Sequence, residues 1–311
     1  MLESEEGRSS VSTWKVLWFA LLLVYLSLSG LLAQGGSPTL TVNIMPLDFF
    51  EEYEPACISV TENGDLIAFQ SPHRVGYGKS DIWLSRFENG KWSPPVNAGP
   101  GINTAASEYD GKLSADGSMM VFIRSDDGVK PTIFISHWRD GAWGPAEPIG
   151  DHISGPDTTE YGAVFSRDGQ RIYFSSDRAG GHGGFDVYYV EKTTEGWSDP
   201  INIGPPVSTE DNEIDAAIGR NEDIIVLAFE REDSLAGGMD LYMSRKENGN
   251  WTPFENMGPR FNTPAKDACA WLGYDGKTLY VNTTWDGLLG GEEMKDSRWG
   301  RVVVFQYSEG F

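Results

Sequence analysis

Short apolar segments joined by tight turns recur along this chain about every 50 residues. The clearest are "KLSADGSMMVF" at 112–122, "VFSRDGQRIYF" at 164–174 and "WLGYDGKTLYV" at 271–281, with weaker copies at 59–69 and 217–227. In the clear copies, two apolar stretches flank an Asp-Gly pair, which is typical of a β-hairpin. Each of the five units is therefore predicted to begin with two antiparallel strands.

Two further blocks complete each unit. A third strand is predicted at "GKSDIWL" (78–84), "GGFDVYY" (183–189) and "GGMDLYM" (237–243). A fourth strand follows a glycine-containing turn and is marked by a tryptophan, at Trp92, Trp143, Trp197 and Trp251. Four short strands repeated at this period predict a β-propeller. No segment after residue 35 keeps a helical period, which excludes a parallel βαβ fold.

The ends of the chain predict how the ring closes. Five first strands begin near Cys57, Asp110, Gly162, Asp215 and Cys269. The fifth unit stops before its fourth strand, and residues 42–54 align without gaps on 201–213 of the third unit. We therefore expect one all-β domain over residues 35–311. It would be a propeller of five blades with four antiparallel strands each, closed by an N-terminal strand that completes the last blade.

The third unit, "SRDGQRIYFSSDRAGGHGGFDVYY", resembles the TolB-like (WD40-like) propeller repeat of bacterial envelope proteins. The resemblance covers roughly residues 40–311 and rests on Ser-x-Asp-Gly, Phe-x-Ser and Gly-x-x-Asp-x-Tyr spacings. Many members have six blades, so five is a departure. The resemblance implies a periplasmic or secreted protein with a binding or scaffold role.

Residues 1–34 are predicted to be a signal peptide or a membrane anchor. An apolar run, "VLWFALLLVYL" at 16–26, follows Lys15 and precedes small residues, as in a secretory signal. Acidic residues before the run, and its extension to about Leu32, leave open an anchor formed by residues 14–34. In both cases the folded part lies outside the cytoplasm.

The net charge of −22 argues against nucleic-acid binding, which needs a basic surface. The chain contains no Gly-x-Ser-x-Gly, His-Glu-x-x-His or Cys-x-x-Cys motif. The glycines at 180–184 lie in a predicted hairpin loop, whereas a phosphate-binding loop lies between a strand and a helix. No cofactor or metal motif is present.

Antiparallel connectivity places all loops between second and third strands on one face, here called the loop face. These loops vary most between units and carry the predicted binding residues Arg74, Arg178, His182, Arg231, Trp285 and Trp299. The repeated tryptophans are instead interpreted as blade-packing residues, because they recur beside a tight turn.

The repeat also places one carboxylate before each first strand, near the axis on the loop face: Glu54, Glu108, Glu160, Glu213 and Asp267. One hypothesis is an acidic binding site at the mouth of the channel that holds a divalent cation or a cationic ligand. The alternative is that each carboxylate accepts bonds from backbone NH groups or from loop arginines and so stabilises its blade.

Cys57 and Cys269 occupy equivalent positions in the first and fifth units, which adjoin where the ring closes. A disulfide between them would lock the ring in an oxidising compartment.

The sequence thus predicts an exported, non-enzymatic propeller that binds an envelope protein or a glycan through its acidic loop face. The membrane would be involved only through an uncleaved anchor. The alternative is a glycan hydrolase that uses the axial carboxylates.

Overall fold

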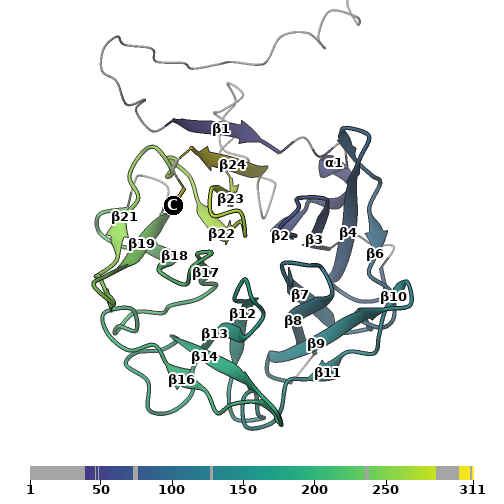
Figure 1. The fold of residues 1–311 in the computed structure, drawn as a ribbon, viewed down its shortest axis with the longest axis horizontal. Coiled ribbons are helices and arrows are strands. Elements are labelled where there is room, and N and C mark those ends of the chain that lie inside the picture. The colour runs from purple at the N-terminus through teal and green to yellow at the C-terminus, as the bar shows by residue number, and fades with distance from the viewer. Residues whose placement is uncertain are drawn as a thin grey trace, which may run out of the picture. The chain divides into compact units, whose positions relative to one another are not determined.

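The computed structural model describes residues 39–45, 47, 49–72, 76–126, 129–234, 238–284, 301–308 and 310–311. Five antiparallel sheets surround a common axis, with the first strand of each innermost (Figure 1). The all-β, five-bladed propeller predicted from the repeat is confirmed. Residues 1–38, which include the predicted signal peptide or anchor, and the predicted binding residues Arg74, Trp285 and Trp299 lie outside the described residues.

Four blades follow one another along the chain. Blade one contains β2 (Ala56–Val60), β3 (Leu66–Ser71), β4 (Asp81–Glu88), β5 (Lys91–Trp92) and β6 (Val96–Asn97). Blade two contains β7 (Ser107–Leu113), β8 (Met119–Ser125), β9 (Thr132–Arg139), β10 (Ala142–Trp143) and β11 (Glu147–Pro148). Blade three contains β12 (Glu160–Phe165), β13 (Arg171–Ser176), β14 (Asp186–Thr193), β15 (Gly196–Trp197) and β16 (Ile201–Asn202). Blade four contains β17 (Ala217–Ile218), β18 (Ile224–Glu230), β19 (Met239–Glu247), β20 (Asn250–Trp251) and β21 (Glu255–Asn256).

The outer edge of each of these blades consists of two short strands where the sequence predicts one. A proline stands between them, at Pro94, Pro145, Pro200 and Pro253. Proline lacks the NH group that a ladder needs and is tolerated only at a sheet edge. The break therefore divides the predicted fourth strand without affecting the sheet inside it.

Blade five is completed by the beginning of the chain. Its strands are β22 (Asp267–Leu272), β23 (Thr278–Thr283), β24 (Arg301–Tyr307) and β1 (Leu40–Ile44). Strand β1 is antiparallel to β24 along its whole length, from Leu40 opposite Tyr307 to Ile44 opposite Val303. The predicted closure is confirmed, but residues 50–53 of the aligned segment form a helical turn, α1 (Phe50–Tyr53).

The tight turns on the face opposite the loop face, here called the turn face, link blades across the axis. Glu62 of blade one accepts bonds from Arg167 of blade three at 2.6 Å and pairs with Arg220 of blade four at 3.4 Å. Arg220 donates to the backbone carbonyl of Tyr274 in blade five. The Tyr274 hydroxyl in turn donates to the backbone carbonyl of Leu113 in blade two. All five blades are joined in this way.

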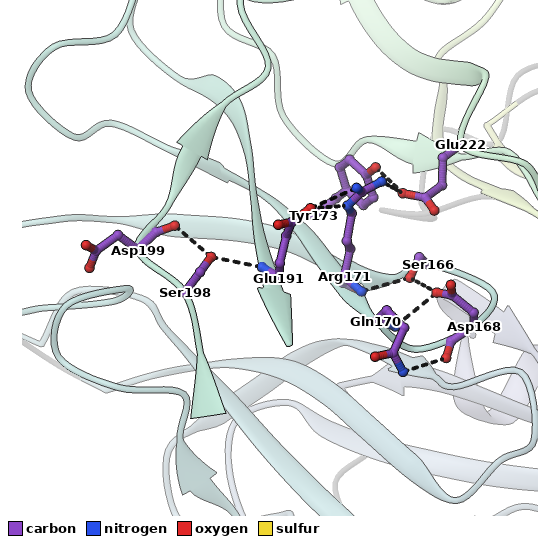
Figure 2. A network of polar contacts seen from close by, with 9 residues as sticks. All are labelled: Ser166, Asp168, Gln170, Arg171, Tyr173, Glu191, Ser198, Asp199 and Glu222. Atoms are coloured by element: carbon purple, nitrogen blue, oxygen red, sulfur yellow. Dashed lines mark hydrogen bonds and ion pairs between the residues drawn. The ribbon is translucent and has the colours of Figure 1, made fainter. Parts of the chain in front are cut away.

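Blades three and four are joined a second time near the same face. Figure 2 shows the Arg171 guanidinium between two carboxylates, 2.8 Å from Glu191 of its own blade and 2.9 Å from Glu222 of the next. Glu222 also accepts a bond from the Tyr173 hydroxyl. Partly exposed ion pairs contribute little to stability one by one. Their position shows, however, that neighbouring blades are joined by ion pairs and hydrogen bonds on the turn face.

Candidate functional site

The repeated carboxylates Glu108, Glu160, Glu213 and Asp267 are all 0% exposed. Three of them, Glu108, Glu213 and Asp267, make the same local contact. In each case the threonine four residues earlier donates both its NH and its hydroxyl to the carboxylate. For Glu213, the donors of Thr209 lie at 3.0 and 2.6 Å. Each carboxylate therefore fixes the chain at the beginning of an inner strand.

Glu160 departs from this pattern. It accepts bonds from Ser154 at 2.5 Å and Ser176 at 3.0 Å, and it lies 3.3 Å from the Arg178 guanidinium. Burial raises the pKa of Glu160, while these donors and Arg178 lower it. The fifth residue, Glu54, is partly exposed and precedes β2 with φ at 45°.

The loop arginines follow the prediction only in part. Arg178 contacts an axial carboxylate, but Arg231 pairs with Asp211 at 2.7 Å instead of Glu213. The partner of Glu108 is Arg124, at 2.7 Å, which sequence reasoning did not single out. Glu108, Glu160, Glu213 and Asp267 therefore do not form an open acidic ring at the channel mouth, because hydrogen-bond donors of the protein enclose all four side chains.

Nearer the centre, a different set of residues meets. One position in each of the five inner segments has a left-handed backbone, with φ between 49° and 59°. The residues at this position are Cys57, Asp110, Gly162, Asp215 and Cys269. The strand pairing shifts register at this place in blades one, two, three and five, as expected for a β-bulge. The bulge turns these residues toward the axis.

The two cysteines of this ring form a disulfide, with their Cα atoms 4.8 Å apart. The bond joins blades one and five, where the ring closes. Beside it lies a cavity of about 10 Å³, lined also by Asp110, Lys112 and Asp215. Such a cavity holds nothing larger than a water molecule.

Lys112 lines this cavity from β7. It is 5% exposed, donates to the carbonyl of Cys57 at 3.0 Å, and lies 5.6 Å from the centre of the Trp271 ring. Burial lowers the pKa of Lys112 and raises that of Asp110, while their attraction opposes both changes. Burial, together with the charge of Asp110, raises the pKa of Asp215 to about 8.

Sequence reasoning missed this cluster. The available signal was a departure from the repeat, since the position two residues after each repeated carboxylate varies in residue type, while the carboxylate itself and a small residue one place further on are kept. At this spacing, Glu108 is followed by Asp110, Glu160 by Gly162, Glu213 by Asp215 and Asp267 by Cys269.

Two of the predicted loop residues, His182 and Arg231, line one pocket of about 490 Å³ between blades three and four. Its walls include Pro205, Glu210 and Phe254, and we call it the His182 pocket. It combines an apolar surface with a few charged groups, which is typical of a recognition site.

A second pocket, of about 430 Å³, lies on the other side of Glu210, over blades four and five. We call it the acidic pocket, because Asp211, Asp215 and Glu230 line it together with Phe229, Met239 and Ala268. Both pockets lie on the loop face and share Glu210 as a lining residue, and we refer to the pair as the depression on the loop face.

Two other features bear on the site. Across the described residues, no group of three or more histidine, cysteine, aspartate or glutamate side chains is arranged to hold a metal ion. The same part of the chain contains no helix with the length and apolarity that crossing a bilayer requires.

Comparison with known proteins establishes the fold and little more. No protein-family model and no curated protein matches the chain. Among solved structures, it is similar to the α-L-arabinofuranosidase of Lactobacillus brevis, with 11% identity, a TM-score of 0.53, and coverage of 86% of this chain and 94% of that one. The catalytic domain of the GH62 α-L-arabinofuranosidase of Coprinopsis cinerea gives 9% identity and a TM-score of 0.52, over 86% and 95% of the two chains.

TolB structures are also among the matches. TolB of Acinetobacter baumannii is 14% identical, with a TM-score of 0.49, over 81% of this chain. The match spans only 54% of the length of that TolB chain. The five-bladed β-propeller fold itself is established by the strand topology of this chain.

Proposed function

We propose that this protein is a non-enzymatic recognition module, exported from the cytoplasm, that binds a protein or glycan partner through the depression on its loop face. One observation carries the proposal. The carboxylates that recur before the inner strands of blades two to five are buried and hydrogen-bonded within the protein, whereas the two pockets beside Glu210 also contain loop residues that differ from blade to blade, such as His182 and Glu230. Unrepeated loop residues on a rigid repeated scaffold are where binding specificity resides.

Export is supported by two features. The apolar run at 16–26 has the layout of a secretory signal or an anchor. The Cys57–Cys269 disulfide belongs to an oxidising compartment, because thiols in the cytosol are kept reduced.

The hydrolase alternative is less well supported. A glycosidase needs two carboxylates that flank the scissile bond and touch the substrate. Glu108, Glu160, Glu213 and Asp267 are inaccessible to any substrate, since all four are fully buried. The carboxylates that remain open to a substrate, among them Asp215 and Glu230 of the acidic pocket, are tested by Asp215→Asn.

The test is partner capture with two matched charge changes. The protein is immobilised and exposed to envelope extract and to a glycan array, beside Glu210→Ala in the depression and Glu247→Ala on the turn face. Both side chains are exposed carboxylates, so each variant removes the same charge. A partner kept by Glu247→Ala and lost by Glu210→Ala supports the proposal. Equal capture by both variants, or turnover of a glycan that Asp215→Asn abolishes, contradicts it.

A further inference from the structure

The outer edge of blade five differs from the outer edges of the other four blades. Blades one to four end in pairs of two-residue strands that are separated by a proline. Blade five ends in β1, a regular strand of five residues that lies at the rim of the ring (Figure 1). Very short edge strands and prolines are two devices by which proteins prevent an edge from pairing with another chain. Strand β1 has neither.

The hydrogen bonds at the two ends of β1 show which of its backbone groups are free. The NH group of Met45 donates to the carbonyl of Val302 at 2.9 Å, and the carbonyl of Thr39 accepts a bond from the NH group of Ser308 at 3.0 Å. Bonded and non-bonded pairs alternate along an antiparallel ladder, so the odd-numbered residues from 39 to 45 bond to β24. The NH and carbonyl groups of residues 40, 42 and 44 therefore point away from the sheet. Within the part of the chain that the structure describes, no group bonds to them.

The residue pattern of β1 matches itself when the strand is reversed. Residues 40, 42 and 44 are leucine, valine and isoleucine, and residues 41 and 43 are threonine and asparagine. In an antiparallel pair centred on Val42, Leu40 stands opposite Ile44 of the other copy, and Thr41 opposite Asn43. Apolar residues then meet apolar residues, and polar residues meet polar ones. The three outward residues of each strand exchange all of their free NH and carbonyl groups.

Charge favours this edge over the other blade edges for contact between two copies. The chain has a net charge of −22, so two copies repel each other. Pairing of identical strands is sensitive to charge, because like charges opposite each other destabilise a sheet. Strand β1 contains no charged residue, whereas the outer strands of blades one, two and four contain Lys91, Glu147 and Glu255. Val42, at the centre of β1, is 39% exposed and adds an apolar contact.

We propose that two copies of this protein associate by antiparallel pairing of their β1 strands. The pairing joins the two fifth blades into one sheet, in which each copy contributes the order β22-β23-β24-β1. Both copies use the same strand and both free edges are consumed, so association stops at the dimer. A contact of one strand from each copy is smaller than a standard interface, and we therefore expect the dimer to dissociate on dilution. No residue of β1 lines the depression on the loop face, which stays open in the dimer.

The experiment measures amide hydrogen exchange by NMR over a series of concentrations of the protein purified from the cell envelope. In the monomer, β24 protects the amides of Thr41 and Asn43, while the amides of residues 40, 42 and 44 point outward. We expect exchange at these three outward amides to slow at least tenfold between dilute and concentrated protein. Protection of Thr41 and Asn43 should not depend on concentration. Light scattering on the same samples should show a mass that rises from one chain to two and no further.

Substitutions within β1 test the register of the pair. Val42→Pro removes an NH group that points away from β24, so the dimer should be lost while the melting temperature is unchanged. Asn43→Pro is its counterpart and should lower the melting temperature, because the NH group of Asn43 bonds to β24. Val42→Cys should form a covalent dimer in air at least tenfold faster than Thr41→Cys, since only residue 42 stands opposite itself. Should Val42→Pro fail to fold, Val42→Lys sets two like charges opposite each other and should also abolish the dimer.

A protein that stays monomeric over the whole series overturns the inference, as does equal oxidation of Val42→Cys and Thr41→Cys. Association that persists in both Val42→Pro and Val42→Lys also overturns it, because the contact then lies outside β1. Slower exchange at residues 40, 42 and 44 that requires envelope extract would assign the edge to a strand of a different polypeptide and exclude the second copy.

Discussion

Glu108 and Glu213 stand at the same place in the repeat and differ in one partner, which makes them a sharp test of how the blades are stabilised. Each accepts a hydroxyl bond at 2.6 Å and an NH bond at 3.0 Å from the threonine four residues before it. Glu108 alone also pairs with Arg124, at 2.7 Å. Replacing each glutamate by glutamine keeps the shape and removes the charge.

The expected magnitudes follow from these contacts. In Glu108→Gln the guanidinium of Arg124, only 19% exposed, loses its carboxylate, and breaking a buried pair costs about 3–5 kcal/mol. Arg124 keeps its bond to the Ile102 carbonyl and its stacking on Phe134, which lowers the expected cost to about 2–3 kcal/mol. In Glu213→Gln no cation is left behind. Burial raises the pKa of Glu213, so its charge opposes folding, and we expect a change of about 1 kcal/mol or less.

Urea unfolding followed by tryptophan fluorescence at pH 7 measures both free energies of unfolding. Equal m-values for the variants and the parent protein would show that the unfolded states are comparable. The difference of about 1–3 kcal/mol between the variants corresponds, at about 2–4 °C per kcal/mol for a large domain, to a gap of about 2–12 °C in melting temperature. If Glu213→Gln is destabilised as much as Glu108→Gln, the threonine bonds dominate and the reasoning from Arg124 is refuted.

Three other outcomes are expected. Reduction of the Cys57–Cys269 bond, which closes a separation of 212 residues, should lower the free energy of unfolding by up to about 5 kcal/mol, and an unchanged melting temperature under reductant would contradict this. The folded pKa of Asp215, about 8, lies above its unfolded value, so the folded state holds an extra proton and stability should fall as pH rises from 5 to 9. A melting-temperature series should show this decline, and Asp215→Asn should flatten it. In Gly162→Ala the added Cβ would lie 2.5 Å from the Asp215 Cα atom, so this variant should unfold or lose more than about 3 kcal/mol of stability. Gly180 has a φ of 91° but open space around it, so Gly180→Ala should lose about 1 kcal/mol. Urea titration measures both losses. Similar costs for both glycines would show that the axial contact is soft.

The candidate site was only partly predictable. His182 and Arg231 could be assigned to the loop face from the alternation of strands alone, and they share a pocket. The exclusion of Glu213 from any binding surface was less visible. The sequence feature that indicated the burial of Glu213 was Thr209, four residues earlier. It is informative only when a threonine at this spacing is known to donate two hydrogen bonds to one carboxylate.

The sequence by itself determined the number of blades, the antiparallel order of their strands and the closure by residues at the beginning of the chain. These properties follow from short-range patterns of apolar residues, turns and prolines, and each unit repeats them independently. Only the tertiary structure decided that Asp110 and Asp215 meet at the axis, beside Lys112 and the disulfide. Residues in different blades come together through a register shift in each inner strand, and no local pattern encodes the charge or the space that results.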